Sequence, residues 1–283
     1  MSPREILRAR AKSVIRSVIP REVRNWVRSP SKTATWLWHS ARFKIGIKEK
    51  LRISEQDTLL CHPLAYLAVR RGQIGDSEQS AEWQQFLSLC HRGMFLFDVG
   101  ANFGIFSLAC AKFGGTAIAI DPSPISTGMI STQLHLNRLA ESVQVLEAAV
   151  GDVEGSLEML SSGIFSDGYF RYETGRDHRE LTRVQLTTVD KLTEQFGVPT
   201  HLKIDVEGFE AAVIRGSMRL LEHHSPLVFL ELHNEMVRSS GGDPSFCVKQ
   251  LQGLNYRISS VYGKPLTSEE AVRPAICRIL ARR

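Results

Sequence analysis

From about residue 60 onward, short apolar runs alternate with longer stretches of helical periodicity, a pattern typical of parallel strands joined by crossover helices. The runs predict strands at residues 96–99, 116–120, 143–150, 201–204 and 227–232, with two weaker strands at 256–259 and 275–281. Helices are expected at residues 105–113, 128–139 and 209–223. Five glycines between residues 151 and 175, followed by alternation at 183–187, indicate loops with a small antiparallel excursion. The sequence therefore predicts one α/β domain over residues 59–283.

Residues 1–58 precede this domain and are predicted to form a basic helical extension. Apolar residues recur at helical spacing between residues 7 and 18, and Pro20 should end that helix. Residues 1–52 contain 14 lysine and arginine residues but only three glutamates, which gives this segment a net charge of +11. Because the whole chain has a net charge of +5, residues 53–283 carry −6. The body is therefore acidic, which makes it a poor binder of polyphosphate, and no nucleic-acid partner is expected.

Three tryptophans in the extension, Trp26, Trp36 and Trp38, favour a boundary between water and lipid. With the basic charge they predict peripheral contact with an anionic membrane through residues 1–52. A helix packed on the domain, a partner-binding arm and an organelle transit peptide stay open as alternatives. No apolar run approaches eighteen residues, so we expect a cytoplasmic protein, peripheral at the inner face of a membrane if the extension binds lipid.

Composition narrows the class of protein. The chain has 283 residues, of which 43% are hydrophobic and 23% charged, as in folded globular proteins and unlike disordered chains. Its five cysteines form an odd number without a close pair, which predicts neither a disulfide framework nor a zinc site: Cys61, Cys90, Cys110, Cys247 and Cys277. Buried thiols in a reducing compartment are expected instead.

A glycine-containing turn follows the first strand of the domain. Residues 97–104 read F-D-V-G-A-N-F-G, and the second strand ends at Asp121, 21 residues after Gly100. A carboxylate at that strand tip is placed to accept hydrogen bonds from the ribose of a nucleoside cofactor. The dinucleotide fingerprint would need a glycine where Asn102 stands, which argues against a nicotinamide oxidoreductase. Asp98 would repel phosphate but suits a cationic amine, so the turn predicts S-adenosyl-L-methionine.

Four motifs together resemble the FkbM family of S-adenosylmethionine-dependent methyltransferases. They are D-V-G-A-N-x-G at residues 98–104, A-V-G-D-x-x-G at 149–155, T-V-D at 188–190 and K-I-D-V-E-G-F-E at 203–210. The resemblance covers roughly residues 60–280. It implies a Rossmann-like class I methyltransferase fold, with a mostly parallel seven-stranded sheet, helices on both faces and an antiparallel last strand. It also implies O-methylation of hydroxyls on sugars or polyketide-type metabolites.

The resemblance further implies where the cofactor binds. Asp98 would lie near the methionine amino group through the loop, and Asp121 would bind the ribose. The backbone of the turn would pass close to the cofactor at Gly100, Ala101, Asn102 and Gly104. Asp152 follows the third strand, where it would contact the adenine amino group or serve as an acid of a surface turn.

Candidate catalytic residues follow the fourth and fifth strands, because ligands of open parallel sheets bind beyond the carboxyl ends of the strands. These residues are Asp205, Glu207, Glu231 and His233. One of them would remove the proton from the acceptor hydroxyl. Two structural alternatives stay open: Glu207 begins the following helix, and Glu231 pairs with Lys203. No metal-ligand motif is present, so no metal is predicted, although a divalent ion between Asp205 and Glu207 is chemically sensible because it would lower a hydroxyl pKa.

The sequence thus predicts an S-adenosylmethionine-dependent O-methyltransferase acting on a hydroxyl of a sugar, glycolipid or secondary metabolite. The acceptor would be a small molecule or a glycan- or lipid-linked group. One alternative is a catalytically silent cofactor-binding or scaffolding protein at a membrane assembly. A nucleic-acid methyltransferase is disfavoured by the acidic body and by the absence of an N-P-P-Y-type motif for a flipped base.

Overall fold

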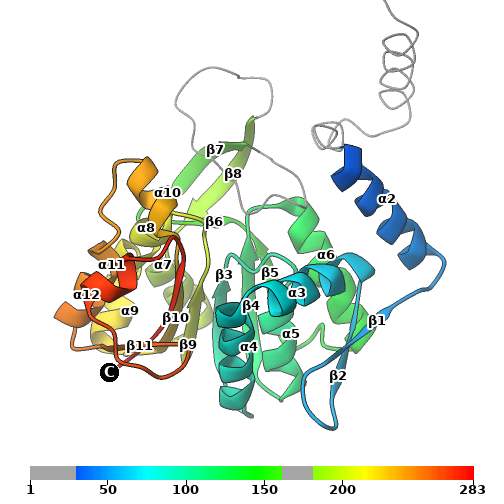
Figure 1. Cartoon of the computed structure of the whole chain (residues 1–283), viewed down its shortest axis with the longest axis horizontal. Coiled ribbons are helices and arrows are strands. Elements are labelled where there is room, and N and C mark those ends of the chain that lie inside the picture. The colour runs from blue at the N-terminus through cyan, green and yellow to red at the C-terminus, as the bar shows by residue number, and fades with distance from the viewer. Residues whose placement is uncertain (1–29, 161–180) are drawn as a thin grey trace, which may run out of the picture.

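A computed structural model describes residues 30–160 and 181–283 of the chain. Its centre is a seven-stranded sheet with the order β11-β12-β10-β9-β3-β4-β5 (Figure 1). The strands of this sheet are β3 (Phe95–Val99), β4 (Thr116–Asp121), β5 (Val143–Glu147), β9 (His201–Ile204), β10 (Leu227–Leu232), β11 (Arg257–Ser260) and β12 (Cys277–Arg282). The last strand, β12, pairs antiparallel with both β10 and β11, whereas β10, β9, β3, β4 and β5 pair in parallel. The predicted α/β fold class is confirmed, including the reversed last strand.

Helices cover both faces of the sheet, which is why most residues of its central strands are buried and apolar. One buried cluster includes residues of α4 (Ser77–Leu89), α5 (Ile105–Lys112) and α6 (Pro124–Asn137). The opposite cluster includes α7 (Val189–Phe196), α8 (Glu210–Arg215), α9 (Met218–His223) and α11 (Phe246–Gly253). Three further helices are α3 (Pro63–Gly75), α10 (Asn234–Ser239) and α12 (Ser268–Val272).

The end of the predicted extension packs with the domain. Strands β1 (Glu49–Arg52) and β2 (Thr58–Cys61) form an antiparallel hairpin, and the expected domain boundary at residue 58 falls at the start of β2. Leu51 and Ile53 are buried in the same cluster as α5 and α6. Before the hairpin, α2 (Pro30–Lys44) lies beside α3 (Figure 1). The helix expected between residues 7 and 18, and Trp26, lie outside the described residues.

Two predicted elements are divided in the structure. The strand expected at 143–150 is two strands, because after β5 the chain leaves the main sheet and β6 (Ala149–Val150) pairs with β8 (Leu181–Thr187). Strand β7 (Gly155–Leu160) pairs antiparallel with β8, which confirms the predicted excursion. The helix expected at 209–223 breaks between α8 and α9 at Gly216, where a Cβ would lie 2.0 Å from the Gly151 carbonyl oxygen. Close approach to the preceding loop therefore requires glycine at that position.

The turn after β3 joins the ends of three strands. The amides of Gly100 and Ala101 both donate to the carbonyl of Ile120 in β4, and the Asp205 amide donates to Val99. Gly100 has φ +80°, and a Cβ there would lie 1.8 Å from the carbonyl oxygen of Asp205. The chain's own backbone therefore requires this glycine, because the predicted cofactor loop contacts the start of the β9–α8 loop here.

Substituting Gly100 should lower the free energy of unfolding more than substituting a glycine that has a positive φ but no close neighbour. Gly93 has φ +87° and nothing within 4 Å of its Cβ position, so Gly93→Ala should lower the free energy of unfolding by about 1–2 kcal/mol. Gly100→Ala adds a backbone collision and should cost about 3 kcal/mol or more. Urea unfolding of both variants measures the difference, and equal costs would contradict the close contact.

Candidate active site

Asp121, the last residue of β4, anchors the turn that follows β3. Its Oδ2 accepts the amide hydrogen of Asn102 at 2.9 Å, and its Oδ1 accepts that of Ser123, also at 2.9 Å. Burial raises the pKa of Asp121 to about 6, although these two hydrogen bonds oppose the shift. Asn102 has φ +48° and Gly104 has φ +70°, so with Gly100 the turn contains three left-handed residues, and Asp121 binds the amide of the middle one. Asp121 therefore fixes the shape of the predicted cofactor loop.

Asp98 lies beneath the same turn, with 2% of its surface exposed. Its Oδ2 accepts hydrogen bonds from the amide and the hydroxyl of Ser107, at 3.2 and 2.7 Å, in the first turn of α5. The residue that precedes α5 is Gly104, which has no side chain to cap the helix. Asp98 thus supplies the capping acceptor. Burial raises the pKa of its carboxyl group, and the nearby ammonium of Lys203 opposes that shift.

Two acids follow one another along the chain here: Glu147 ends β5, and Asp152 follows β6. Glu147 pairs in register with Asp121, and its side chain accepts a hydrogen bond from the Thr127 hydroxyl at 3.2 Å. Glu147 was not predicted from the sequence, although its place at the end of a parallel strand was a usable signal. Asp152 forms an ion pair of 2.8 Å with Arg215, and both side chains are well exposed, at 39% and 48%. This contact is the surface arrangement that was one of the two expectations for Asp152.

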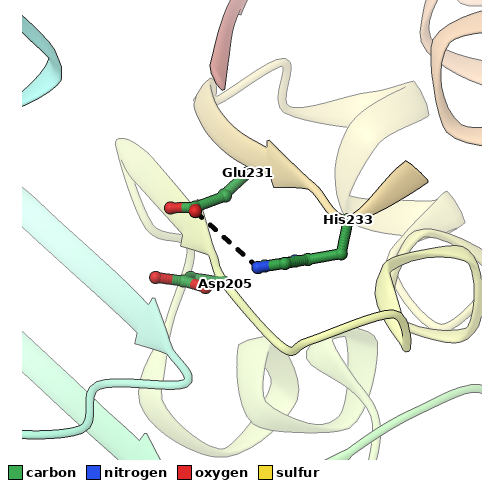
Figure 2. A group of neighbouring side chains, drawn as sticks. All are labelled: Asp205, Glu231 and His233. Atoms are coloured by element: carbon green, nitrogen blue, oxygen red, sulfur yellow. Dashed lines mark ion pairs between the residues drawn. The ribbon is translucent and has the colours of Figure 1, made fainter. Parts of the chain in front are cut away.

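The four predicted catalytic residues come together at the ends of β9 and β10. We call Asp205, Glu207, Glu231 and His233 the rim cluster. His233 Nε2 lies 3.1 Å from Glu207 Oε2 and 3.6 Å from Glu231 Oε1. Asp205 lies close to both Glu231 and His233 (Figure 2). Residues 205 and 233, far apart in sequence, thus face one another because β9 and β10 are parallel neighbours.

Glu207 reaches the rim cluster through an unusual backbone conformation. Its φ is +52° and that of Gly208 is +94°, so two consecutive left-handed residues turn the chain between β9 and α8. The helix begins at Glu210, after Phe209, and therefore not at Glu207. Strained backbone of this kind is stored preferentially at functional sites.

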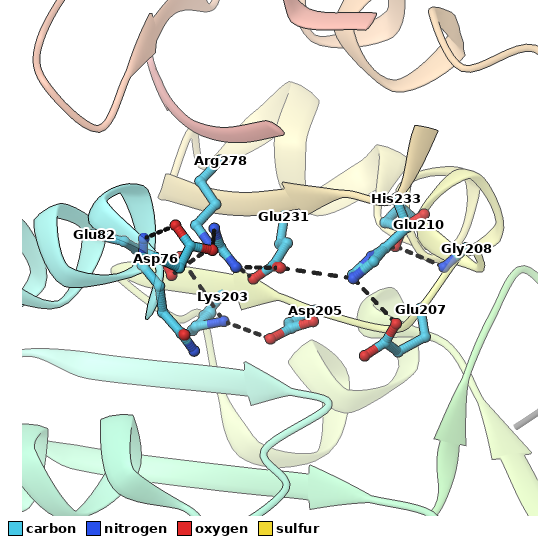
Figure 3. Close-up of polar contacts among 11 residues, drawn as sticks. Asp76, Glu82, Lys203, Asp205, Glu207, Gly208, Glu210, Glu231, His233 and Arg278 are labelled. Atoms are coloured by element: carbon cyan, nitrogen blue, oxygen red, sulfur yellow. Dashed lines mark hydrogen bonds and ion pairs between the residues drawn. The ribbon is translucent and has the colours of Figure 1, made fainter. Parts of the chain in front are cut away.

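Glu210 holds the other side of the imidazole. Its Oε1 lies 2.7 Å from His233 Nδ1 and also accepts the amide hydrogen of Gly208 at 2.8 Å (Figure 3). Glu210 is 1% exposed, and its Oε2 has no hydrogen-bond partner among the described residues. His233 is therefore fixed in orientation by a buried carboxylate.

Basic residues hold the remaining carboxylates. Arg278 of β12 donates to both oxygens of Glu231, at 2.7 and 3.1 Å, and to Asp76 at 2.7 Å. Lys203 lies 3.3 Å from Asp205 and 3.9 Å from Glu82, both measured to carboxylate oxygens. The expected pairing of Glu231 with Lys203 is thus replaced by a bidentate pairing with Arg278, directly opposite Glu231 in the sheet.

The electrostatics of the rim cluster favour a positive charge on His233. Burial opposes that charge, but the hydrogen bond to Glu210 and the carboxylate of Glu207 outweigh burial and raise the pKa of His233 to about 9. Burial raises the pKa of Glu231, and Asp205 adds to that shift, whereas Arg278 opposes it. A proton is therefore retained in this cluster at neutral pH.

Three buried residues of this network were missed by sequence reasoning: Glu82, Glu210 and Arg278. Arg278 carried a signal, because it interrupts an otherwise apolar strand. Glu210 belongs to the K-I-D-V-E-G-F-E motif and follows Glu207 by three residues. No sequence signal marked Glu82 as buried, since a glutamate within a helix is most often exposed.

Comparison of the sequence with known protein families identifies the family of this chain. Residues 98–258, more than half of the chain, match the Methyltransferase FkbM domain. The chain belongs to the FkbM methyltransferase family. This range begins at Asp98 and contains the rim cluster. The Rossmann-like class I methyltransferase fold expected for the family is the fold observed here.

Individual relatives are distant. A ribosomal protein L11 methyltransferase of Desulfitobacterium hafniense is 29% identical over 75 residues, which are 26% of this chain and 24% of that protein. A crystal structure of the methyltransferase FkbM from Methylobacillus flagellatus KT is similar with a TM-score of 0.46 and 12% identity, over 77% of this chain and 58% of that one. A precorrin-6y C5,15-methyltransferase of Geobacter metallireducens GS-15 has a TM-score of 0.44 and 14% identity, over 72% and 89%. The match thus covers about a quarter of the length of the ribosomal protein L11 methyltransferase.

The raised pKa of His233 makes stability depend on pH. A histidine with a native pKa of about 9 and an unfolded pKa of about 6.5 contributes stability that is present below pH 6.5 and is lost as pH rises through 9. The full contribution is on the order of 3 kcal/mol. Urea unfolding in chelator-treated buffer between pH 6 and 9.5 should show this loss in the unmodified protein.

The matched controls are two histidine variants. His233→Asn should remove this part of the pH dependence, whereas His223→Asn, at an exposed histidine of α9, should retain it. An identical profile for both variants would show that His233 is not the titrating group.

Proposed function

We propose that this chain is an S-adenosylmethionine-dependent O-methyltransferase that acts on a hydroxyl of a sugar, glycolipid or secondary metabolite. The observation that carries the proposal is the contact between Gly100 and Asp205, which brings the cofactor loop of the FkbM family directly beside a cluster of acids. A methyl donor and a group that takes a hydroxyl proton must lie next to each other for this reaction.

The described residues fit a nucleoside cofactor without phosphates. A carboxylate accepts about four hydrogen bonds, and Asp121 accepts one backbone amide on each oxygen and a side-chain hydrogen bond from Ser126, which leaves an acceptor for a ribose hydroxyl. The backbone around Gly100, Ala101, Asn102 and Gly104 would lie along the methionine part of the cofactor. Asp98, which accepts hydrogen bonds from Ser107, would lie beneath this loop near the methionine amino group. For the adenine amino group, exposed Glu147 is a second candidate beside Asp152, which is paired with Arg215.

The cofactor, when bound, supplies an electrophilic methyl group on a sulfonium. The chain's own task is to orient the hydroxyl and accept its proton. Glu207 and Asp205 suit that task, because their side chains are 30% and 31% exposed. His233 already holds a proton at neutral pH, and Glu231 is engaged by Arg278, so both would orient the acceptor.

The acceptor proposal rests on the chemistry of the rim cluster. Its carboxylates are hydrogen-bond acceptors suited to the hydroxyls of a polyol. No aromatic side chain belongs to the cluster, whereas a flat nucleobase is usually held by aromatic stacking. A silent scaffolding protein would have no need for the left-handed backbone at Glu207 that directs its carboxylate to His233.

Cofactor binding and turnover should separate in two variants. S-adenosylmethionine or its demethylated product should raise the melting temperature, and NAD should not. Asp121→Ala should abolish most of this shift, because it removes the ribose acceptor and frees the loop. Glu207→Gln should retain the shift but lower turnover by about 10²- to 10⁴-fold, since a base acts mainly on the transition state.

Turnover is measured by transfer of labelled methyl groups to extracted envelope glycans, lipids and RNA. Label in the glycan or lipid fraction is the expected outcome. Label confined to RNA would contradict the proposed acceptor class, and stabilisation by NAD equal to that by S-adenosylmethionine would contradict the cofactor.

We also propose that the basic extension binds an anionic membrane surface. Four large apolar side chains between residues 37 and 47 are exposed: Leu37, Trp38, Ile45 and Ile47. Apolar side chains of this kind beside a basic segment are typical of interfacial attachment. None of the helices over residues 30–160 and 181–283 has the length and hydrophobicity needed to cross a bilayer.

Substitution at the apolar side chains should weaken this attachment. Trp38→Ser combined with Ile45→Ser should reduce co-sedimentation with vesicles that contain anionic lipid, and high salt should reduce it further. Tyr262→Ser, at an aromatic side chain that is also 61% exposed, serves as the control and should bind normally. Binding that is independent of lipid charge would contradict the proposal.

A further inference from the structure

His233 has the carboxylate support that metal-binding histidines normally have. Metal-ligating imidazoles usually donate one ring N–H to a carboxylate, which fixes the ring and leaves the other nitrogen for the ion. Here Nδ1 lies 2.7 Å from Oε1 of Glu210, a glutamate with 1% exposure. The other nitrogen, Nε2, points toward carboxylates from both β10 and the loop after β9 (Figure 3). Glu210 thus fixes Nε2 in a position suited to a ligand atom.

Two carboxylates complete a set of three ligand atoms. One oxygen of Asp205, one oxygen of Glu231 and one nitrogen of His233 all lie within 4.8 Å of one another (Figure 2). The separation of His233 Nε2 and Glu231 Oε1 is 3.6 Å, which fits two ligands of one ion at bond lengths of about 2.0–2.2 Å. Asp205 is the least buried of the three, so its carboxylate has room to move onto the ion.

The charges around these atoms favour a cation. Among the described residues, the fixed cations of the connected network are Lys203 and Arg278, and they hold Asp205 and Glu231 from the side opposite His233 (Figure 3). The network contains seven carboxylates: Asp76, Glu82, Asp98, Asp205, Glu207, Glu210 and Glu231. A divalent ion would offset part of this excess of negative charge in a region of low dielectric.

We propose that Asp205, Glu231 and His233 bind one divalent cation, with Glu210 as the positioning residue for His233. A mixed set of imidazole and carboxylate ligands suits Mn²⁺ or Zn²⁺ better than Ca²⁺, which prefers oxygen ligands alone. The site differs from the Asp205–Glu207 pair considered from sequence, and it departs from the expectation that the chain holds no metal. Glu207 stays outside the ligand set, beside it.

This arrangement assigns separate tasks to the rim cluster. An ion held by three protein ligands keeps open positions at which an acceptor hydroxyl can bind, and binding to the ion lowers the pKa of that hydroxyl. Glu207, 3.1 Å from His233 Nε2 and partly exposed, is then placed to accept the proton. This role in catalysis rests on the proposed function, whereas binding of the ion does not.

The test is a titration of the full chain, stripped with chelator, with Mn²⁺ and no cofactor or acceptor. Electron paramagnetic resonance measures free Mn²⁺, and competition with Zn²⁺ and Mg²⁺ ranks the ions. The expected result is one saturable site per chain that Zn²⁺ displaces. Absence of a saturable site for both Mn²⁺ and Zn²⁺ would overturn the proposal and leave the cluster as a salt-bridge network.

Variants locate the site. His233→Ala should weaken Mn²⁺ binding more than tenfold, and Glu210→Gln should weaken it about 10- to 100-fold although it keeps all three ligands. The matched controls are His223→Ala and Glu222→Gln, which change the same residue types at exposed positions of α9 and should bind normally. If His233→Ala does not fold, Asp205→Asn, at the least buried of the three ligands, tests the same site.

The outcomes separate this site from the methyltransferase proposal. Mn²⁺ binding that survives both His233→Ala and Asp205→Asn would place the ion elsewhere and overturn the site. Methyl transfer at full rate in chelator, with no bound ion, would overturn the ion's role in catalysis and leave the proposed function intact. Saturable binding that depends on His233, in a chain without methyl transfer, would support the site and contradict the function.

Discussion

The ammonium group of Lys203 is buried in the centre of the sheet, and the site is built around compensating it. The side chain is 2% exposed, and its Nζ lies 4.5 Å from the centre of the Phe106 ring. An isolated charge in such a place would cost many kcal/mol, so it persists only with nearby countercharges. Burial works against the charged form of Lys203, but Glu82 and Asp205 outweigh it and keep the pKa raised. Lys203 is thus compensated by Glu82 of α4, Asp205 of the rim cluster and Asp98 of the neighbouring strand β3.

These acids outnumber the charge that they compensate, and the chemistry of the rim follows from that excess. Arg278 neutralises Glu231 from the last strand, yet Asp205, Glu207 and Glu210 still surround one imidazole. These acids favour a positive species at His233 Nε2, either a proton or the proposed ion. The rim cluster lies between the buried Lys203 and Glu210 and the partly exposed Asp205 and Glu207, where a polar acceptor can enter.

The sequence was most informative where one physical rule governs several residues. Apolar runs predicted the seven strands of the main sheet, because strands covered on both faces are mostly apolar. The rule that ligands bind beyond the carboxyl ends of parallel strands was enough to group Asp205, Glu207, Glu231 and His233 from the sequence alone. This rule does not tell which way a side chain points, so Lys203 was considered as a partner of Glu231, whereas Arg278 lies directly opposite Glu231.

Contacts between segments that are distant along the chain could not be predicted from the sequence. The strand at 143–150 shows no turn residue, so nothing marks the place where Ala148 leaves one sheet for another. The break at Gly216 arises from approach to Gly151, 65 residues earlier, and a glycine in a helical pattern gives no hint of what it approaches. Glu82 belongs to a helix whose other polar residues are mostly exposed or half-exposed, and only the packed structure reveals that it faces Lys203.

The octet K-I-D-V-E-G-F-E at residues 203–210 is specific because successive residues meet different physical demands. Alternation along the strand directs Lys203 and Asp205 to the charged face and Ile204 to the apolar cluster behind it. Left-handed conformations at Glu207 and Gly208 then reverse the chain, so that Glu207 and Glu210 reach opposite nitrogens of the same imidazole. A glycine is favoured at the second of these positions, where a Cβ would come within 3.2 Å of Met236. Eight consecutive residues thus supply the buried cation, two acids of the rim and the support of its histidine.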